Sequence, residues 1–230
     1  WISAKANKVF SKWNCSEDSN CLNIGFVSAD LRNHPVGYFL ENILNSIDKS
    51  RIKLFAYSNL KKEDELSERI KPAFSSWKQI INKSDKDTAE LIHDDGIHIL
   101  FDLSGHTAKN RLPVFAYKPA PIQVTWLGYW ATTGVAEMDY ILGDPYRTPY
   151  EDKDHFTETI WQLPETSLCF SEPKDKVDIK PLPALSNGFI TFGCFNNLTK
   201  MTDEVVKVRA DILKAVPGSK LFLKSKLLDS

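Results

Sequence analysis

The chain has 230 residues, 42% of them hydrophobic and 26% charged, an ordinary globular composition that excludes a collagen, a disordered tail or a disulfide scaffold. Its 29 lysines and arginines balance 30 aspartates and glutamates, so no overall field attracts nucleic acid or a membrane surface, and we expect neither as a partner. No apolar run approaches the roughly 18–20 residues of a membrane span, and no signal peptide is visible. The four cysteines show no metal-binding spacing. We therefore expect a cytoplasmic protein without a metal site.

Short hydrophobic segments alternate with amphipathic ones along the first 170 residues. Several of the hydrophobic segments are nearly continuous, as expected of strands in a parallel sheet that is covered on both faces. Alternation of such strands with helices predicts βαβ units and an α/β domain over residues 22–170. The predicted strands are 22–29, 52–58, 77–81, 97–103, 122–127, 139–144 and 160–163, and the predicted helices are 36–48, 63–73, 86–95 and 109–117.

The character of the chain changes after residue 170. Residues 171–187 are charged and rich in proline, without hydrophobic periodicity, and are predicted to be a linker. Beyond them we predict a strand at 188–196, a helix at 202–216 and a strand at 220–225, which form a new βαβ unit. A parallel sheet of two strands leaves its faces uncovered. We therefore expect residues 188–230 to begin a second α/β domain and the chain to be a fragment.

The first candidate site residue follows the first predicted strand. In parallel α/β sheets, ligands collect at the carboxyl ends of the strands. His34 lies there and precedes Pro35, which disfavours helical geometry at His34 and can itself open the next helix. His34 is thus a candidate for catalysis. The alternative is a loop histidine that caps the helix or is simply solvated.

The fourth predicted strand delivers Asp102 to the same edge. His106 follows it closely, after Gly105, which permits a tight turn. An aspartate in this position can orient a histidine that serves as a base or as a hydrogen-bond donor. The alternative is that Asp102 caps the turn and that Thr107 caps the next helix.

Two further segments carry weaker signals for a bound ligand. The Gly/Thr-rich loop that contains Gly128 would let the backbone approach a sugar or a phosphate. Lys200 precedes the predicted helix at 202–216, beside free N–H groups and the positive end of the helix dipole, and Asn197 is close to it in sequence. This arrangement suits an anion, although a solvated lysine is the common alternative.

Four motifs, in order, resemble the catalytic region of the O-GlcNAc transferase/SPINDLY family. They read IGFVSADLRNHPVGYF, ILFDLSGHTAKNRL, KPAPIQVTWLGYWATTGVAEMDYILGDP and FGCFNNLTKMTDEVV, and the resemblance runs from about Asn23 to the end of the chain. It implies a GT-B architecture, with a Rossmann-like parallel-sheet domain, the beginning of a second Rossmann-like domain, and a nucleotide-sugar donor between them. It also implies inverting, metal-independent transfer of a sugar to Ser or Thr hydroxyls of a protein or peptide, with no cofactor besides the donor substrate.

The resemblance also implies roles for individual residues. His34, Asp102 and His106 match the family's candidate catalytic positions, and residues 1–21 match the end of a helical segment that follows TPR repeats. Lys200 matches the lysine that holds the donor diphosphate. The residues at donor-binding positions are Thr107, Gly128, Asn197 and Lys200.

The leading hypothesis is therefore a protein O-glycosyltransferase that uses UDP-GlcNAc, or GDP-fucose as plant SPINDLY-type proteins do. A second hypothesis is a non-catalytic fragment that binds peptides or proteins in the same cleft. A third is another nucleotide-sugar enzyme of the same superfold, such as an epimerase, and the N-H-P and D-L-S-G-H-T motifs argue against it. If the second domain is incomplete, the isolated chain should transfer little sugar, because the nucleotide would be enclosed on one side only.

Overall fold

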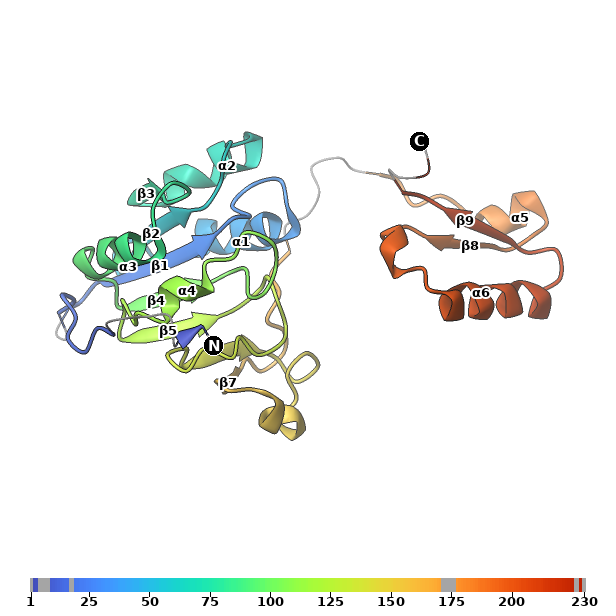
Figure 1. Cartoon of the computed structure of the whole chain (residues 1–230). Coiled ribbons are helices and arrows are strands. Elements are labelled where there is room, and N and C mark those ends of the chain that lie inside the picture. The colour runs from blue at the N-terminus through green and yellow to red at the C-terminus, as the bar shows by residue number, and fades with distance from the viewer. Residues whose placement is uncertain (1, 4–8, 17–18, 171–176, 226–227, 229–230) are drawn as a thin grey trace. The chain divides into compact units, whose positions relative to one another are not determined.

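The computed structural model describes residues 2–3, 9–16, 19–170, 177–225 and 228 of the chain (Figure 1). The chain divides into two compact units, Trp1–Glu172 and Pro173–Ser230. The division between them falls within the charged, proline-rich segment 171–187, where the sequence predicts a linker.

The first unit is built on a seven-stranded sheet in which all neighbouring strands are parallel (Figure 1). The strand order is β3-β2-β1-β4-β5-β6-β7. The chain winds outward from β1 in one direction and from β4 in the other, which is the doubly wound, Rossmann-type arrangement. The predicted α/β fold class is therefore confirmed. The strands are β1 (Leu22–Ser28), β2 (Ile52–Ser58), β3 (Ser76–Gln79), β4 (Ile99–Asp102), β5 (Ile122–Thr125), β6 (Tyr140–Gly143) and β7 (Thr159–Gln162).

Helices cover both faces of this sheet, which explains why its strands are nearly continuously hydrophobic. On one face, Leu40 of α1 and Leu66 of α2 pack into a core cluster with Leu54 of β2. On the other, Ile92 of α3 and Phe115 of α4 belong to a second cluster. The helices are α1 (Pro35–Ser46), α2 (Glu65–Ile70), α3 (Asp85–Asp94) and α4 (Leu112–Phe115), and the 3₁₀ turns are η2 (Lys71–Ala73) and η3 (Tyr150–His155).

The helix predicted at 109–117 is much shorter in the structure, where only α4 is helical. Two lysines explain its limits. Lys109 and Lys118 have φ values of 64° and 54°, in the left-handed region that breaks a right-handed helix. A helix between them can span only a few residues.

The N-terminal segment is held by contacts with the domain. Phe10 stacks on His93 of α3, with ring centroids 4.1 Å apart, and Trp13 Nε1 donates a hydrogen bond of 2.9 Å to the Lys118 carbonyl. The described part of residues 1–21 contains no α-helix, whereas we expected a helical segment there. The remaining residues of that segment lie outside the described part of the chain.

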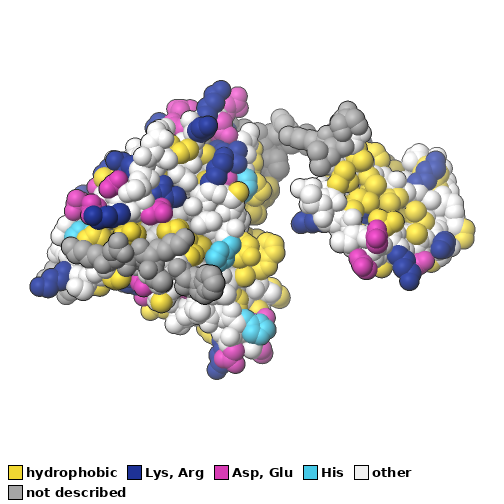
Figure 2. Space-filling model, in the orientation of Figure 1, with side chains coloured by type: hydrophobic (Ala, Val, Ile, Leu, Met, Phe, Trp, Pro, Cys, Tyr) yellow, Lys and Arg dark blue, Asp and Glu magenta, His cyan; other side chains and the backbone are white. Residues whose placement is uncertain are grey.

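The second unit contains a βαβ unit, as the sequence predicts. β8 (Thr191–Cys194) and β9 (Lys220–Leu223) pair in parallel, and η4 (Leu198–Lys200) and α6 (Asp203–Ala215) connect them. Figure 2 shows hydrophobic side chains gathered on the surface of this unit. The exposed hydrophobic residues of this unit include Phe195 and Phe222, which are 68% and 53% exposed.

The linker predicted at 171–187 is in part helical, which corrects the prediction. Its last five residues form α5 (Pro183–Asn187). Proline is favourable at the first position of a helix, and Gly188 ends α5 in the left-handed conformation, with φ of 71°. None of the helices in the described part of the chain is long and apolar enough to cross a membrane.

The core predicts the effect of one substitution in the central strand. Leu100 of β4 is completely buried, so Leu100→Ala should leave a cavity and lower the free energy of unfolding by about 2–5 kcal/mol. Leu22→Ala is the matched control, because Leu22 of β1 is 39% exposed, and it should cost about 1 kcal/mol or less. Urea denaturation followed by tryptophan fluorescence measures both. Equal losses would contradict the central position of β4.

Candidate active site

Two loops leave the sheet where its strand order reverses. β1 and β4 are neighbours and pair in parallel, with Val27 opposite Asp102. From β1 the chain passes through α1 to β2, and from β4 it passes through α4 to β5 on the other side. Connections that diverge in this way leave the crevice in which α/β proteins bind ligands. The structure thus brings the loops that carry His34 and His106 to the same edge from adjacent strands.

His34 is the N-cap of α1. Its backbone is extended, with φ of −153° and ψ of 151°, and its Nδ1 accepts a hydrogen bond of 3.3 Å from Val36 N. An imidazole that accepts at Nδ1 is neutral and carries its proton on Nε2. Asp30 Oδ2 lies 3.9 Å from Nδ1, but Nδ1 can donate to it only if the cap is lost. His34 therefore caps the helix, as the alternative interpretation has it, and offers an N–H donor at Nε2.

Asp102 is completely buried and organises the loop after β4. Its Oδ1 accepts from Ser104 N at 3.1 Å, and its Oδ2 accepts from Gly105 N at 2.8 Å and Thr125 Oγ1 at 3.0 Å. Burial raises the pKa of Asp102 to about 6, although these hydrogen bonds act to lower it. No hydrogen bond between described atoms joins Asp102 to His106, which acts to lower the pKa of this carboxyl through space when its ring is protonated. Asp102 thus caps the turn and does not orient the imidazole directly.

His106 is anchored through one nitrogen and free at the other. Its Nε2 lies 2.9 Å from the Thr133 carbonyl oxygen, and because a carbonyl can only accept, Nε2 carries a proton. Nδ1 of the neutral ring then keeps its lone pair and forms no hydrogen bond with the described residues. The exposed ring meets Tyr129 edge-on, with centroids 5.7 Å apart. His106 can take up a proton at Nδ1 without losing its anchor, as a general base must.

Glu158 fixes the carbonyl that anchors His106. This glutamate directly precedes β7 and is 5% exposed. Its Oε1 accepts from Thr133 N at 2.7 Å and from the Thr133 hydroxyl, and its Oε2 accepts from Thr132 Oγ1 at 2.8 Å. Glu158 was not predicted as a site residue. Its position before a hydrophobic strand marks it only as an unusual residue, since glutamate is rarely buried without a partner, and nothing local in the sequence points to Thr133.

Two glycines let the loops after β4 and β5 interlock. A Cβ atom at Gly128 would lie 1.9 Å from the Leu103 carbonyl oxygen. A Cβ atom at Gly105, whose φ is 52°, would lie 2.3 Å from Tyr129 Cβ. Side chains at these positions would push the loops apart, so Gly128 serves the packing of the loop beside His106.

Thr107 is bonded within its own loop. Its hydroxyl donates to the Ser104 carbonyl at 2.7 Å, and its carbonyl accepts from Asn110 Nδ2 at 2.9 Å. It does not cap α4, which has Arg111 as its N-cap residue. The interpretation of Thr107 as a helix cap is therefore wrong, and the structure makes it part of the turn that presents His106.

Asn197 and Lys200 belong to the second unit. Asn197 Oδ1 accepts from Thr199 N at 3.1 Å, which caps η4, and Lys200 ends that turn with an exposed side chain. Thr202 caps α6, as the predicted helix start requires. Asp203 follows in the first turn of α6. In the described part of the chain, no group of three or more His, Cys, Asp or Glu residues is placed to hold a metal ion.

Comparisons with known proteins identify what the chain is similar to. Residues 2–172 match the model of glycosyl transferase family 41. The chain is 38% identical to the probable UDP-N-acetylglucosamine–peptide N-acetylglucosaminyltransferase SPINDLY of Arabidopsis thaliana, over 98% of this chain and 25% of that protein. It is 39% identical to the UDP-N-acetylglucosamine–peptide N-acetylglucosaminyltransferase of Caenorhabditis elegans, over 63% of this chain and 13% of that protein. These shares mean that the chain spans a quarter or less of these two relatives.

A solved structure gives the same result for the fold. A mutant of the Thermobaculum terrenum O-GlcNAc transferase superimposes with a TM-score of 0.85 at 38% identity, covering 92% of this chain and 40% of the other. The resemblance of the four motifs to the O-GlcNAc transferase/SPINDLY family is thereby confirmed.

The raised pKa of Asp102 predicts a pH-dependent contribution to stability. Its folded-state pKa is about 6, against an ordinary value of about 3.9. The folded protein therefore holds this proton more tightly than the unfolded chain does. The resulting contribution to the free energy of unfolding is complete below pH ~4 and is lost as the pH rises through ~6. The free energy of unfolding, measured relative to Asp102→Asn in urea, should fall by up to about 3 kcal/mol between pH 4 and pH 7.

Asp144→Asn is the matched control for that measurement. Burial acts to raise the pKa of Asp144, but hydrogen bonds from Ser167, Arg147 and Tyr146 outweigh it and lower the pKa to about 2. This contribution is present above pH ~4 and lost only as the pH falls toward 2, so the difference from wild type should stay constant between pH 4 and pH 7. A constant difference for Asp102→Asn as well would contradict the burial of the Asp102 charge.

The contacts of Glu158 predict its effect on His106. Glu158→Ala leaves the N–H and hydroxyl of Thr133 without their acceptor, so the Thr133 carbonyl should move and His106 should populate both tautomers. Glu158→Gln keeps an acceptor oxygen and should preserve the Nε2–H tautomer. The ¹⁵N chemical shifts of the imidazole nitrogens measure this directly. Identical shifts in wild type and Glu158→Ala would contradict the positioning role.

Proposed function

The chain belongs to glycosyl transferase family 41, and on that premise we propose that it forms part of an enzyme that transfers a sugar to Ser or Thr hydroxyls of proteins. Two of its relatives are named UDP-N-acetylglucosamine–peptide N-acetylglucosaminyltransferases, which supports UDP-GlcNAc as the donor and a protein or peptide as the acceptor. GDP-fucose is the alternative donor. Cys21, Cys169 and Cys194 form no disulfide, as suits a reducing cytoplasm. Because the chain spans only part of its relatives, the activity is proposed for the protein that contains it.

The contrast between the two histidines supports the proposal most strongly. His106 can accept a proton at Nδ1 while its Nε2–H remains bonded to the Thr133 carbonyl. His34 accepts from Val36 N at Nδ1, so a second proton on this ring would break the helix cap. We therefore assign the general base to His106 and a hydrogen-bonding role to His34, through its Nε2–H.

The proposed reaction is a single displacement. The acceptor hydroxyl oxygen attacks the anomeric carbon as the bond from that carbon to the donor diphosphate breaks. The electron pair of that bond leaves with the diphosphate, and the hydroxyl proton passes to His106 Nδ1. Attack opposite the leaving group inverts the anomeric configuration.

The second unit supplies the group proposed to stabilise the leaving diphosphate. Lys200 carries a positive charge three residues before α6 begins at Asp203. A cation next to a helix N-terminus suits a phosphate oxygen that gains negative charge. In this proposal Lys200 and Asn197 bind the donor, and the charge on the leaving diphosphate is balanced without a metal ion.

Replacement of His106 tests the assignment. In the protein that contains these residues, His106→Ala should lower kcat for sugar transfer to a Ser/Thr peptide by about 10²- to 10⁴-fold, the usual contribution of a general base. His34→Ala should lower kcat less, because it removes a helix cap and a hydrogen-bond donor but not the proposed base. Exposed His155→Ala is the matched control and should retain activity. Transfer from UDP-GlcNAc and from GDP-fucose is measured by mass spectrometry of the peptide.

The outcomes separate the alternatives. Transfer from GDP-fucose but not from UDP-GlcNAc would identify GDP-fucose as the donor and leave the proposed reaction unchanged. Unchanged kcat in His106→Ala would contradict its role as the base. Peptide binding without transfer from either donor would favour the non-catalytic binding module.

A further inference from the structure

A basic cavity lies at the same edge of the first sheet as the candidate active site. Its volume is about 500 Å³. Asn59, which lines it, directly follows β2, and Lys109, which also lines it, lies three residues after His106 in the loop after β4. The loop that presents His106 therefore also contributes a wall of this cavity. Its charged and polar lining residues include Asn59, Lys61, Lys83, Asp85, Lys109 and Arg111.

The positive charge in this lining is not neutralised by neighbours. Asp85 is paired with Arg111 Nε at 2.7 Å, so their charges offset. The ammonium groups of Lys61, Lys83 and Lys109 form no ion pair or hydrogen bond with any residue that the structure describes, and all three side chains are exposed. Three unpaired cations around one cavity create a local positive potential in a chain whose net charge is −1.

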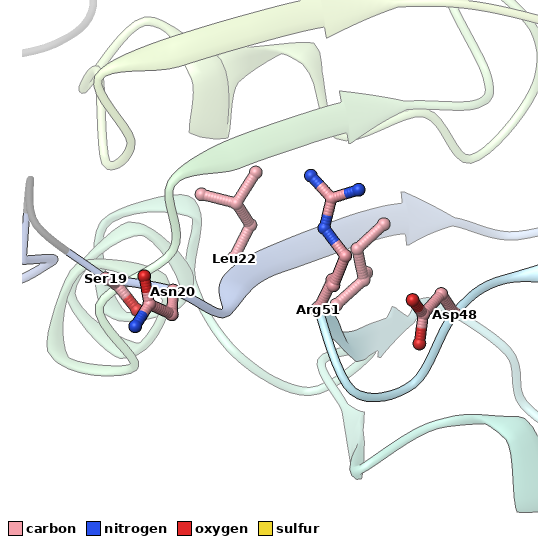
Figure 3. Close-up of a pocket in the computed structure, with 6 residues that line it drawn as sticks. Ser19, Asn20, Leu22, Asp48 and Arg51 are labelled. Carbon is pink, nitrogen blue, oxygen red and sulfur yellow. The ribbon is translucent and has the colours of Figure 1, made fainter.

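A cavity at the opposite edge of the sheet lacks this feature. It has a volume of about 460 Å³ and lies where β1 and β2 begin (Figure 3). Arg51 in its lining is accompanied by Asp48, and the charge of Arg51 helps to lower the pKa of that carboxyl, after the hydrogen bonds from Ser50. One cation and one anion offset each other there. The excess of positive charge thus distinguishes the cavity beside the His106 loop.

Arg111 gives the basic cavity a fixed wall. Its Nη1 donates to the Ile80 carbonyl at 2.9 Å and to Asn59 Oδ1 at 3.3 Å, and its Nη2 donates to the Lys83 carbonyl at 3.0 Å. Asn59 Nδ2 in turn donates to the Lys109 carbonyl at 2.9 Å. Lys109 is held in a left-handed conformation, with φ of 64°, which is unfavourable for a residue with a side chain. This wall is held by hydrogen bonds, whereas the ammonium groups of its lysines form none with the described residues.

This chemistry favours carboxylates on a flexible chain over a tightly held phosphate. Phosphate sites typically use a bidentate arginine or converging backbone N–H groups. Here the guanidinium of Arg111 is committed to the protein, and Ser84 and Asp85 cap and charge the start of α3. The groups left for a ligand are separate, mobile ammonium ions. They suit several carboxylates that arrive together on one peptide.

We infer that this cavity binds an acidic stretch of the acceptor polypeptide, next to the hydroxyl that receives the sugar. The inference rests on the proposed function, which supplies the acceptor. It adds a preference for acceptors that carry acidic residues beside the modified hydroxyl, which the proposed reaction alone does not require. In this inference, Lys61, Lys83 and Lys109 bind the carboxylates of the acidic stretch. The loop that carries Lys109 also carries His106, so it connects the acidic stretch to the site of sugar transfer.

The experiment measures binding without the donor, so that it does not depend on transfer. Two fluorescent peptides share one Ser/Thr centre and differ in a flanking run of glutamates or glutamines. By anisotropy, the 230-residue chain should bind the glutamate peptide about tenfold more tightly at low salt, and the difference should shrink as salt rises. Lys61→Gln/Lys83→Gln/Lys109→Gln should abolish the difference. The triple variant of exposed Lys49, Lys153 and Lys207 to glutamine has the same net charge and should preserve it.

A charge reversal makes the test independent of any general loss of binding. Replacing the same three cavity lysines by glutamate should make the chain prefer a lysine-run peptide, with thermal melts checking that it is folded. A glutamate preference that survives in the cavity variant, or disappears equally in the control, would overturn the inference. Tighter binding of inorganic pyrophosphate than of the glutamate peptide, through the same lysines, would assign a phosphate site instead. Absence of sugar transfer with the binding preference intact would contradict the proposed function and leave the peptide site standing.

Discussion

The buried carboxylate of Asp102 is the contact on which the shape of the candidate site depends. A charged group at the end of a central strand is costly to bury, and here the cost is visible in a pKa raised to about 6. Three donors offset part of it, namely Ser104 N, Gly105 N and the Thr125 hydroxyl. Two of them belong to the loop after β4 and one to the neighbouring strand. The carboxylate thus ties the first residues of the loop to the sheet, and only a loop tied in this way presents His106 in a defined place.

A second buried carboxylate has the same effect from the other side of His106. Glu158 binds the loop that contains Thr133, whose carbonyl accepts the proton-bearing nitrogen of His106. Because Glu158 directly precedes β7, the edge of the sheet takes part in positioning a ring that follows β4. This gives a role to β7, which lies at the edge of the sheet and away from the reversal of strand order. Glu158, at the start of β7, fixes the second anchor of the ring.

The sheet and half of the site could be predicted from the sequence because both follow from local pattern. Buried parallel strands are continuously hydrophobic, and residues that follow them, such as His34 and His106, arrive at one edge. Glu158 could not be found in this way, since its partner Thr133 lies 25 residues away and no local pattern joins them. The predicted length of the helix at 109–117 was wrong for a related reason. A hydrogen bond from a distant asparagine side chain stabilises the left-handed residue at its start, and no helix propensity encodes that bond.

The loop after β4 has two anchored ends and two chemically distinct positions between them. Asp102 holds its beginning, and Arg111 and Asn59 hold its end. His106 near one end contacts the loop after β5, whereas Lys109 near the other lines the basic cavity beside the end of β2. A segment fixed at both ends cannot move one position without straining the other. Because both ends are already anchored, an acceptor bound at the Lys109 end through its acidic stretch would meet a proposed base, His106, that is already held in place.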